Sequence, residues 1–251
     1  MTPAPAVPFV EGGAVTERLS ASQVGRHMAC HASANLELAI PGYEKPVEDR
    51  TADTAANRGN DIHEDLARVM KHPARDVKAI AEALAYVAEV QGRRRFKVLV
   101  EQSIKATWLK GEPETTVDLV LYVEDEIHVI DWKTGRIKVE AINNTQLWYY
   151  AASFAPLAPR AKGVTVHIVQ PWADNIDWQW VPTTDLSVFM AQVQQTEDAI
   201  LGGDLSFGPS DHCMFCAANP HGRGLRGSQN CPAMMQILYP SVVDEAEILG
   251  L

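Results

Sequence analysis

The stretch that most constrains the fold is Val129–Arg136, with the sequence VIDWKTGR. Its first two residues are β-branched and apolar, which predicts a short buried strand, and Gly135 marks a turn directly after it. Asp131 and Lys133 are two residues apart, so their side chains point to the same face of such a strand. A carboxylate that can bind a divalent metal therefore lies beside a cation that can stabilise a developing negative charge. The alternative for this pair alone is an ordinary ion pair on an exposed strand edge.

A second apolar strand is predicted just upstream, over Thr116–Val123, with Asp118 near its start. The short acidic run Glu124–Glu126 between the two strands predicts a tight turn, and hence an antiparallel hairpin. This hairpin brings Asp118 close to Asp131. Two carboxylates that converge repel each other unless a cation neutralises them, so the hairpin predicts a metal site.

These residues resemble the PD-(D/E)XK nuclease superfamily, in its RecB-like branch. The resemblance rests on Asp118, on Asp131-Trp132-Lys133 with Thr134 and Gly135, on His63 in a helix before the strands, and on Gln146 and Tyr150 in the helix after them. Four cysteines, one before and three after the core, are similar to those of the iron–sulfur nucleases of the AddB and CRISPR-adaptation type. The resemblance covers the chain from about Ser20 to Pro232.

The resemblance implies a metal-dependent DNA nuclease, an exonuclease by type, that acts in recombination, repair, or CRISPR or phage DNA processing. It implies that His63, Asp118, Asp131 and the backbone carbonyl of Trp132 hold one or two Mg²⁺ or Mn²⁺ ions. Lys133 then orients the attacking water or stabilises the transition state, and Gln146 and Tyr150 position backbone phosphates. The expected partner is DNA, single-stranded or an end-containing duplex, together with a recombination or CRISPR protein.

The cysteines form a second group. Cys213 and Cys216 are spaced so that both thiolates can reach one metal centre, and Cys231 precedes a proline. Cys30 is the only cysteine left to serve as a fourth ligand; without it, a histidine such as His212 or His221 is needed. Spacing alone leaves a structural zinc ion open, whereas the resemblance implies a [4Fe–4S] cluster. The loop between Cys216 and Cys231 is longer than in the families that the chain resembles.

Composition narrows the class of protein. With 251 residues, 46% hydrophobic and 22% charged, the chain has enough apolar residues for one sizeable core. It shows no apolar run that would span a bilayer and no signal peptide, which predicts a cytoplasmic protein without a membrane partner. Four cysteines without a secretory signal favour ligation over disulfides. A net charge of −10 argues against broad nonspecific DNA binding but leaves room for a local basic groove.

The expected fold class is α/β, with a PD-(D/E)XK (restriction-endonuclease-like) core: a mixed central sheet flanked by helices, an N-terminal helical layer and a C-terminal cysteine-ligated region. Helices are expected at about 20–40, 50–71, 76–91, 140–154 and 184–201, and strands at 98–106, 116–123, 129–132, 163–169 and 178–181. We expect a flexible leader (1–18), one nuclease domain (19–235) and a tail (236–251). Within the domain, 19–95 is helical, 96–202 is the catalytic core, and 203–235 binds the cluster and is closed by Cys30.

Two other functional classes remain open from the sequence. One is a catalytically silent subunit with the same fold that binds DNA or assembles with other proteins. The other is a zinc-stapled structural protein in which Asp131 and Lys133 occur together by chance. Cleavage polarity, strand preference and sequence specificity are not encoded in any recognisable pattern.

Overall fold

The structure is a computed structural model that describes residues 19–40, 42–43, 78–219 and 231–238. Its described residues fall into two compact units. The sheet unit comprises residues 20–22 and 78–192, and the cysteine unit comprises Leu19 and residues 23–40, 42–43, 193–219 and 231–238. No helix among the described residues is both long and apolar enough to cross a membrane.

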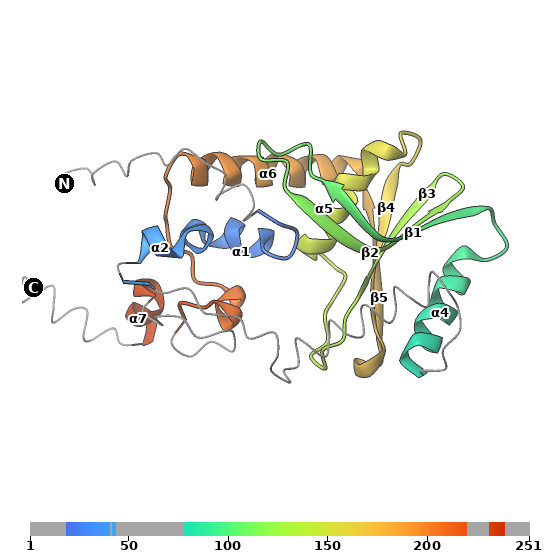
Figure 1. Cartoon of the computed structure of the whole chain (residues 1–251), viewed down its shortest axis with the longest axis horizontal. Coiled ribbons are helices and arrows are strands. Elements are labelled where there is room, and N and C mark those ends of the chain that lie inside the picture. The colour runs from blue at the N-terminus through green and yellow to red at the C-terminus, as the bar shows by residue number, and fades with distance from the viewer. Residues whose placement is uncertain (1–18, 41, 44–77, 220–230, 239–251) are drawn as a thin grey trace, which may run out of the picture. The chain divides into compact units, whose positions relative to one another are not determined.

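A five-stranded mixed sheet forms the centre of the sheet unit (Figure 1). Its strands are β1 (Phe96–Lys105), β2 (Glu114–Val123), β3 (Glu126–Trp132), β4 (Gly163–Gln170) and β5 (Asn175–Pro182), in the spatial order β1-β2-β3-β4-β5. Only β3 and β4 are parallel, and the helix α5 (Thr145–Phe154) lies on the crossover between them. The element order α4-β1-β2-β3-α5-β4 is the order expected from the sequence.

The hairpin β2–β3 confirms the expected approach of the two aspartates. The antiparallel register pairs Leu119 with Ile130, so the next position along it sets Asp118 opposite Asp131. Glu124 in the connecting turn has a φ of 57°, which a tight reversal requires. Two strands that are apolar over most of their length therefore end with both acids at the same edge of the sheet.

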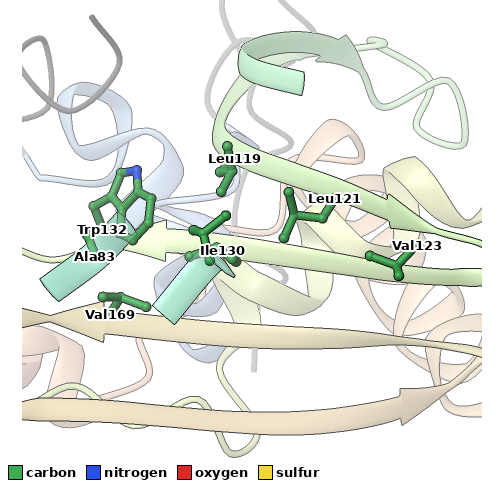
Figure 2. Packing of buried hydrophobic residues seen from close by; sticks show 8 residues of the cluster. Ala83, Leu119, Leu121, Val123, Ile130, Trp132 and Val169 are labelled. Carbon is green, nitrogen blue, oxygen red and sulfur yellow. The ribbon is translucent and has the colours of Figure 1, made fainter. Parts of the chain in front are cut away.

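One face of the sheet packs against α4 (Lys78–Gln91), a helix that the alanine-rich periodic pattern predicts. Figure 2 shows Trp132 and Ile130 of β3 in this layer, together with apolar residues of β2 and Val169 of β4. Because side chains alternate along a strand, Asp131 points to the opposite face, which α5 covers. The core on one face thus fixes the direction of the acid on the other.

The edge strand β5 is longer than the four residues expected. Its residues alternate in exposure, and Ile176, Trp178 and Trp180 are about half exposed. Trp180 lies across Gly163 of β4, where an added β-carbon would come within 2.7 Å of the indole ring. After β5 the chain enters α6 (Thr183–Leu201), as its apolar period predicts.

The expected single helix over residues 20–40 is wrong. The cysteine unit instead holds α1 (Val24–Ala29), a 3₁₀ turn (His31–Ala34) and α2 (Leu36–Ala39), and Cys30 lies at the break with an extended backbone. The Ser33 hydroxyl donates to the carbonyl of Cys30 at 2.6 Å, and its oxygen also lies 2.9 Å from Nδ1 of His27. The bond from the Ser33 hydroxyl to the backbone competes with the helical hydrogen bonds, and the helix ends here. Gln23 is the N-cap of α1 and makes no side-chain cap bond.

Three further elements complete the described part of the cysteine unit. They are the C-terminal half of α6, a 3₁₀ turn at Asp211–Phe215 that contains Cys213, and α7 (Pro232–Leu238), which begins directly after Cys231. Short 3₁₀ turns in the sheet unit lie at Ala155–Leu157 and Pro171–Ala173. The expected leader, the helix at 50–71 and most of the tail fall outside the described residues, and the domain boundaries remain predictions.

Candidate functional site

A polar network on the α5 face of the sheet joins the site residues that the sequence predicts. Asp118 comes from β2, Asp131 from β3, Lys133 from the residue after β3, and Gln146 and Tyr150 from α5. Asn144 sets the start of the helix, since its side chain accepts a hydrogen bond from the amide of Leu147 at 3.2 Å. This start is later than expected, because residues 140–144 form a loop. Gln146 and Tyr150 are one helical turn apart and share the face toward the sheet.

The network is continuous from Asp131 to Tyr150. Lys133 Nζ lies 2.7 Å from Oδ2 of Asp131 and donates to Oε1 of Gln146 at 3.0 Å. The amide nitrogen of Gln146 donates to the Tyr150 hydroxyl at 2.8 Å and lies 3.4 Å from Oδ1 of Asp131. Asp131 is only 3% exposed, so the carboxylate sits in a largely desolvated position beside a cation. Such an arrangement holds the lysine in a defined place and orientation.

Asp118 is connected through the backbone. Its Oδ2 accepts a hydrogen bond from the amide of Trp132 at 2.7 Å. The indole of Trp132 points into the core on the other face, so the residue contributes only its backbone to this side. This hydrogen bond fixes the Asp118 carboxylate beside β3, the strand that carries Asp131.

Tyr150 stays protonated in this setting. Burial raises the pKa of its hydroxyl far above the ordinary value of 10, and the negative charge of Asp131 raises it further. A phenol that is neutral at working pH adds no negative charge beside the two aspartates. Its neighbour Tyr149 is fully buried, as expected for an aromatic residue that packs rather than binds.

Sequence reasoning missed Gln170, the fully buried last residue of β4. Its amide nitrogen donates to the carbonyls of Gly135 at 2.7 Å and Ile137 at 2.8 Å, and its oxygen accepts from the amide of Val139 at 3.1 Å. This one side chain fixes the loop that follows Lys133. A glutamine at the end of an apolar strand was the available signal.

The described carboxylates provide part of a ligand set for a divalent metal. Among the residues that the structure describes, no three His, Cys, Asp or Glu side chains come together as a metal-binding group. Asp118 and Asp131 provide two oxygen donors at one edge, which is the ligand type that Mg²⁺ and Mn²⁺ prefer. The third expected side chain, His63, lies outside the described residues. Glu101 of β1, a further candidate acid, takes the register position opposite Asp118 with a φ of 48°.

The second candidate site is a small cavity in the cysteine unit that is partly open to solvent. It is lined by all four cysteines, Cys30, Cys213, Cys216 and Cys231, which are free thiols. Segments far apart in the chain meet here. Gly208 approaches α1 so closely that a β-carbon would overlap the carbonyl of Ala29, the residue before Cys30.

Backbone and electrostatic interactions link the four cysteines. The amide of Cys231 donates to the carbonyl of Ala218 at 3.0 Å, which ties α7 to the turn that carries the other two C-terminal thiols. Burial raises the pKa of the Cys216 thiol, and the nearby Cys213 and Cys30 raise it further. Burial also raises the pKa of Cys231, with smaller contributions from Cys216 and Cys30. The thiols therefore lie close enough around the cavity to affect one another's ionisation.

All four thiols line this one small cavity. A tetrahedral zinc ion, with Zn–S bonds of about 2.3 Å, draws its sulfurs close together. No three of the described cysteines form such a compact group, although all four line the same space. The donor set, four free thiols, is of the type that either a structural zinc ion or an iron–sulfur cluster takes.

The chain is similar to two solved structures and to one protein family. No curated protein matches the chain. A crystal structure of "Putative exonuclease" from Eubacterium rectale is 10% identical, with a TM-score of 0.47, over 96% of this chain and 99% of that one. A crystal structure of SSO0001 is 16% identical, with a TM-score of 0.39, over 90% of this chain and 89% of that one. A family model described as "Protein of unknown function (DUF2800)" matches residues 70–249. Since this match spans well over half of the sequence, the chain belongs to the DUF2800 family.

Proposed function

We propose that this protein is a metal-dependent deoxyribonuclease of the exonuclease type, built on a PD-(D/E)XK core. The observation that carries the proposal is the network of Asp118, Asp131, Lys133, Gln146 and Tyr150 on one face of the sheet. An acid pair with a half-buried lysine held between a carboxylate and an amide is more organised than a chance surface ion pair. The substrate would be single-stranded DNA or a duplex with free ends.

Asp118, Asp131, the backbone carbonyl of Trp132 and His63 would hold one or two Mg²⁺ or Mn²⁺ ions. A bound divalent cation supplies Lewis acidity, which polarises a phosphodiester and lowers the pKa of an attacking water. The two carboxylates also need such a charge, because a pair of acids at one strand edge is costly without one.

Lys133 would stabilise the negative charge that develops on the phosphate. Its ammonium is half-buried and already held by Asp131 and Gln146, so little reorganisation is needed when the substrate binds. Gln146 acts as the positioning residue, since it bonds to Asp131, Lys133 and Tyr150 together. The neutral Tyr150 would lie beside the phosphates of the bound strand.

The cysteine cavity would hold a [4Fe–4S] cluster that joins Cys30 to the three C-terminal cysteines. Cluster ligation supplies folding energy, because the metal–thiolate bonds form only in the folded chain. Recombination, repair, and CRISPR or phage DNA processing are the settings in which such a nuclease would act with a protein partner.

The test is digestion of end-labelled single- and double-stranded DNA by anaerobically purified protein with Mg²⁺ or Mn²⁺. Lys133→Ala and Asp118→Ala should each lower the cleavage rate by at least about 100-fold. Lys138→Ala is the matched control, because that lysine is exposed and lies outside the network. His63→Ala should weaken Mn²⁺ binding measured by calorimetry.

Other results would favour the alternative functions. DNA binding without cleavage in both metals indicates a silent subunit. Colourless protein with zinc and no acid-labile sulfide indicates a zinc-stapled protein. Wild-type cleavage rates in either network variant would show that the site assignment is wrong.

A further inference from the structure

Arg26 lines the same cavity as the four cysteines. It belongs to α1 and precedes Cys30 by four residues, and the amide of Cys30 donates to its carbonyl at 2.8 Å. The Nε of Arg26 is buried and has no hydrogen-bond partner among the residues that the structure describes. A buried guanidinium N–H is rarely left unsatisfied, so this atom calls for an acceptor.

The charge around the cavity also favours a negatively charged acceptor for Arg26. Arg26 is the only arginine or lysine among the described residues of the cysteine unit. Four thiolates around a metal group carry net negative charge, and a buried negative charge needs a nearby cation or hydrogen-bond donors.

We propose that Arg26 is the charge partner of the cysteine-held cluster, and that its guanidinium raises the reduction potential of that cluster. This inference rests on the cluster assigned under the proposed function. Net charge and hydrogen bonds near the sulfurs are among the terms that set iron–sulfur potentials. A fixed cation favours the reduced form, which carries one more negative charge, and therefore shifts the potential upward. Arg26 would act on the cluster and is not a residue that touches DNA.

The test compares wild-type protein with Arg26→Gln and Arg26→Lys, all purified anaerobically. Iron and acid-labile sulfide are measured first, and the potential is then found by titration with dithionite while the reduced cluster is followed by electron paramagnetic resonance. Arg26→Gln should shift the reduction equilibrium at least about tenfold toward the oxidised form, which is about 59 mV for one electron. Arg26→Lys keeps the charge without the planar fork and should shift it less. Arg160→Gln, which removes an exposed arginine of the sheet unit, should leave the potential unchanged.

The outcomes separate the two proposals. Wild-type protein without iron and sulfide would refute the cluster, and the role of Arg26 with it. A loaded wild type and a loaded Arg26→Gln with equal potentials would refute only the role of Arg26. If folded Arg26→Gln loses its cluster, retention of the cluster by Arg26→Lys supports the charge role, and equal loss in both variants contradicts it. Circular dichroism establishes which variants are folded.

Discussion

A buried histidine pair on the α4 face of the sheet should make the stability of the sheet unit fall in mild acid. The Tyr86 hydroxyl lies 2.8 Å from Nδ1 of His167, and Nε2 of His167 lies 3.1 Å from Nδ1 of His128. Nε2 of His128 then faces the carboxylate of Glu126 at 3.4 Å, which Arg94 also binds at 2.6 Å. One direction satisfies every atom: each hydrogen bond is donated toward Glu126. Both rings must be neutral for this chain to form.

The magnitude follows from the pKa of His167. Burial, with a smaller contribution from the neighbouring His128, lowers it from 6.5 to about 3. The side chain is only 3% exposed, so screening by solvent changes this little. Because the folded pKa lies below the unfolded one, the unfolded state binds more protons between pH 3 and 6.5. The stabilisation is therefore complete above pH 6.5 and is lost as the pH falls toward 3, at about 1.4 kcal/mol per pH unit.

The assay is urea unfolding at pH 7.5 and 5.0, for wild type and His167→Gln with the same metal content. Glutamine can accept from Tyr86 and donate to His128 but does not titrate. Between these pH values the wild type should lose about 2 kcal/mol more than the variant, since other titrating groups are common to both. His128, whose pKa burial also lowers, is present in both proteins and adds a loss of the same sign to each. A difference between the two proteins that stays constant with pH would refute the buried neutral pair.

Three further predictions concern single side chains. Cys30→Ser should lower iron content and melting temperature as much as Cys213→Ser does; full metal and stability in the first variant would show an ordinary buried thiol. Gly163→Ala should lower the free energy of unfolding by about 1–3 kcal/mol, because the β-carbon would lie 2.5 Å from the Val181 carbonyl and 2.7 Å from Trp180. Gly135→Ala is its control, since the nearest atom there is 3.9 Å away and an equal loss would contradict the packing. Gln170→Leu should slow DNA cleavage about tenfold or more by freeing the loop after Lys133; an unchanged rate would show that this loop needs no anchor.

The hairpin at the site was predictable because its signals are local. Two apolar strands flank an acidic turn, and the spacing alone sets Asp118 beside Asp131. The pairing of Gln146 with Tyr150 was equally local, since residues four apart on a helix share a face.

The break at Cys30 and the late start of α5 were not predictable in the same way. The break depends on the Ser33 hydroxyl bonding to the Cys30 carbonyl rather than on any helix-breaking residue. The loop before α5 is held by side chains about 30 positions away: Asp177 accepts from the amide of Ala141 at 2.7 Å, and Gln179 accepts from that of Asn143 at 2.8 Å. Long-range bonds of this kind leave no periodic trace in the sequence.

The position of Arg26 in the cysteine cavity was likewise not visible in the sequence. Its helix carries no metal motif, and only the fold brings it to the same cavity as the C-terminal thiols. Residues 93–95 are three consecutive arginines, and the fold uses at least one of them, since Arg94 forms an ion pair with Glu126.

Asp131→Asn offers the most direct test of the central claim that the Asp131 network is a metal-dependent nuclease site. The asparagine keeps the shape and burial of the side chain but removes the charge that pairs with Lys133 and would bind the metal. Single-turnover cleavage of an end-labelled strand in Mn²⁺ should proceed in the wild type and fall by at least about 100-fold in the variant, with unchanged circular dichroism and cluster content. Equal cleavage rates in the two proteins, or a wild type that cleaves equally well in excess chelator, would contradict the account.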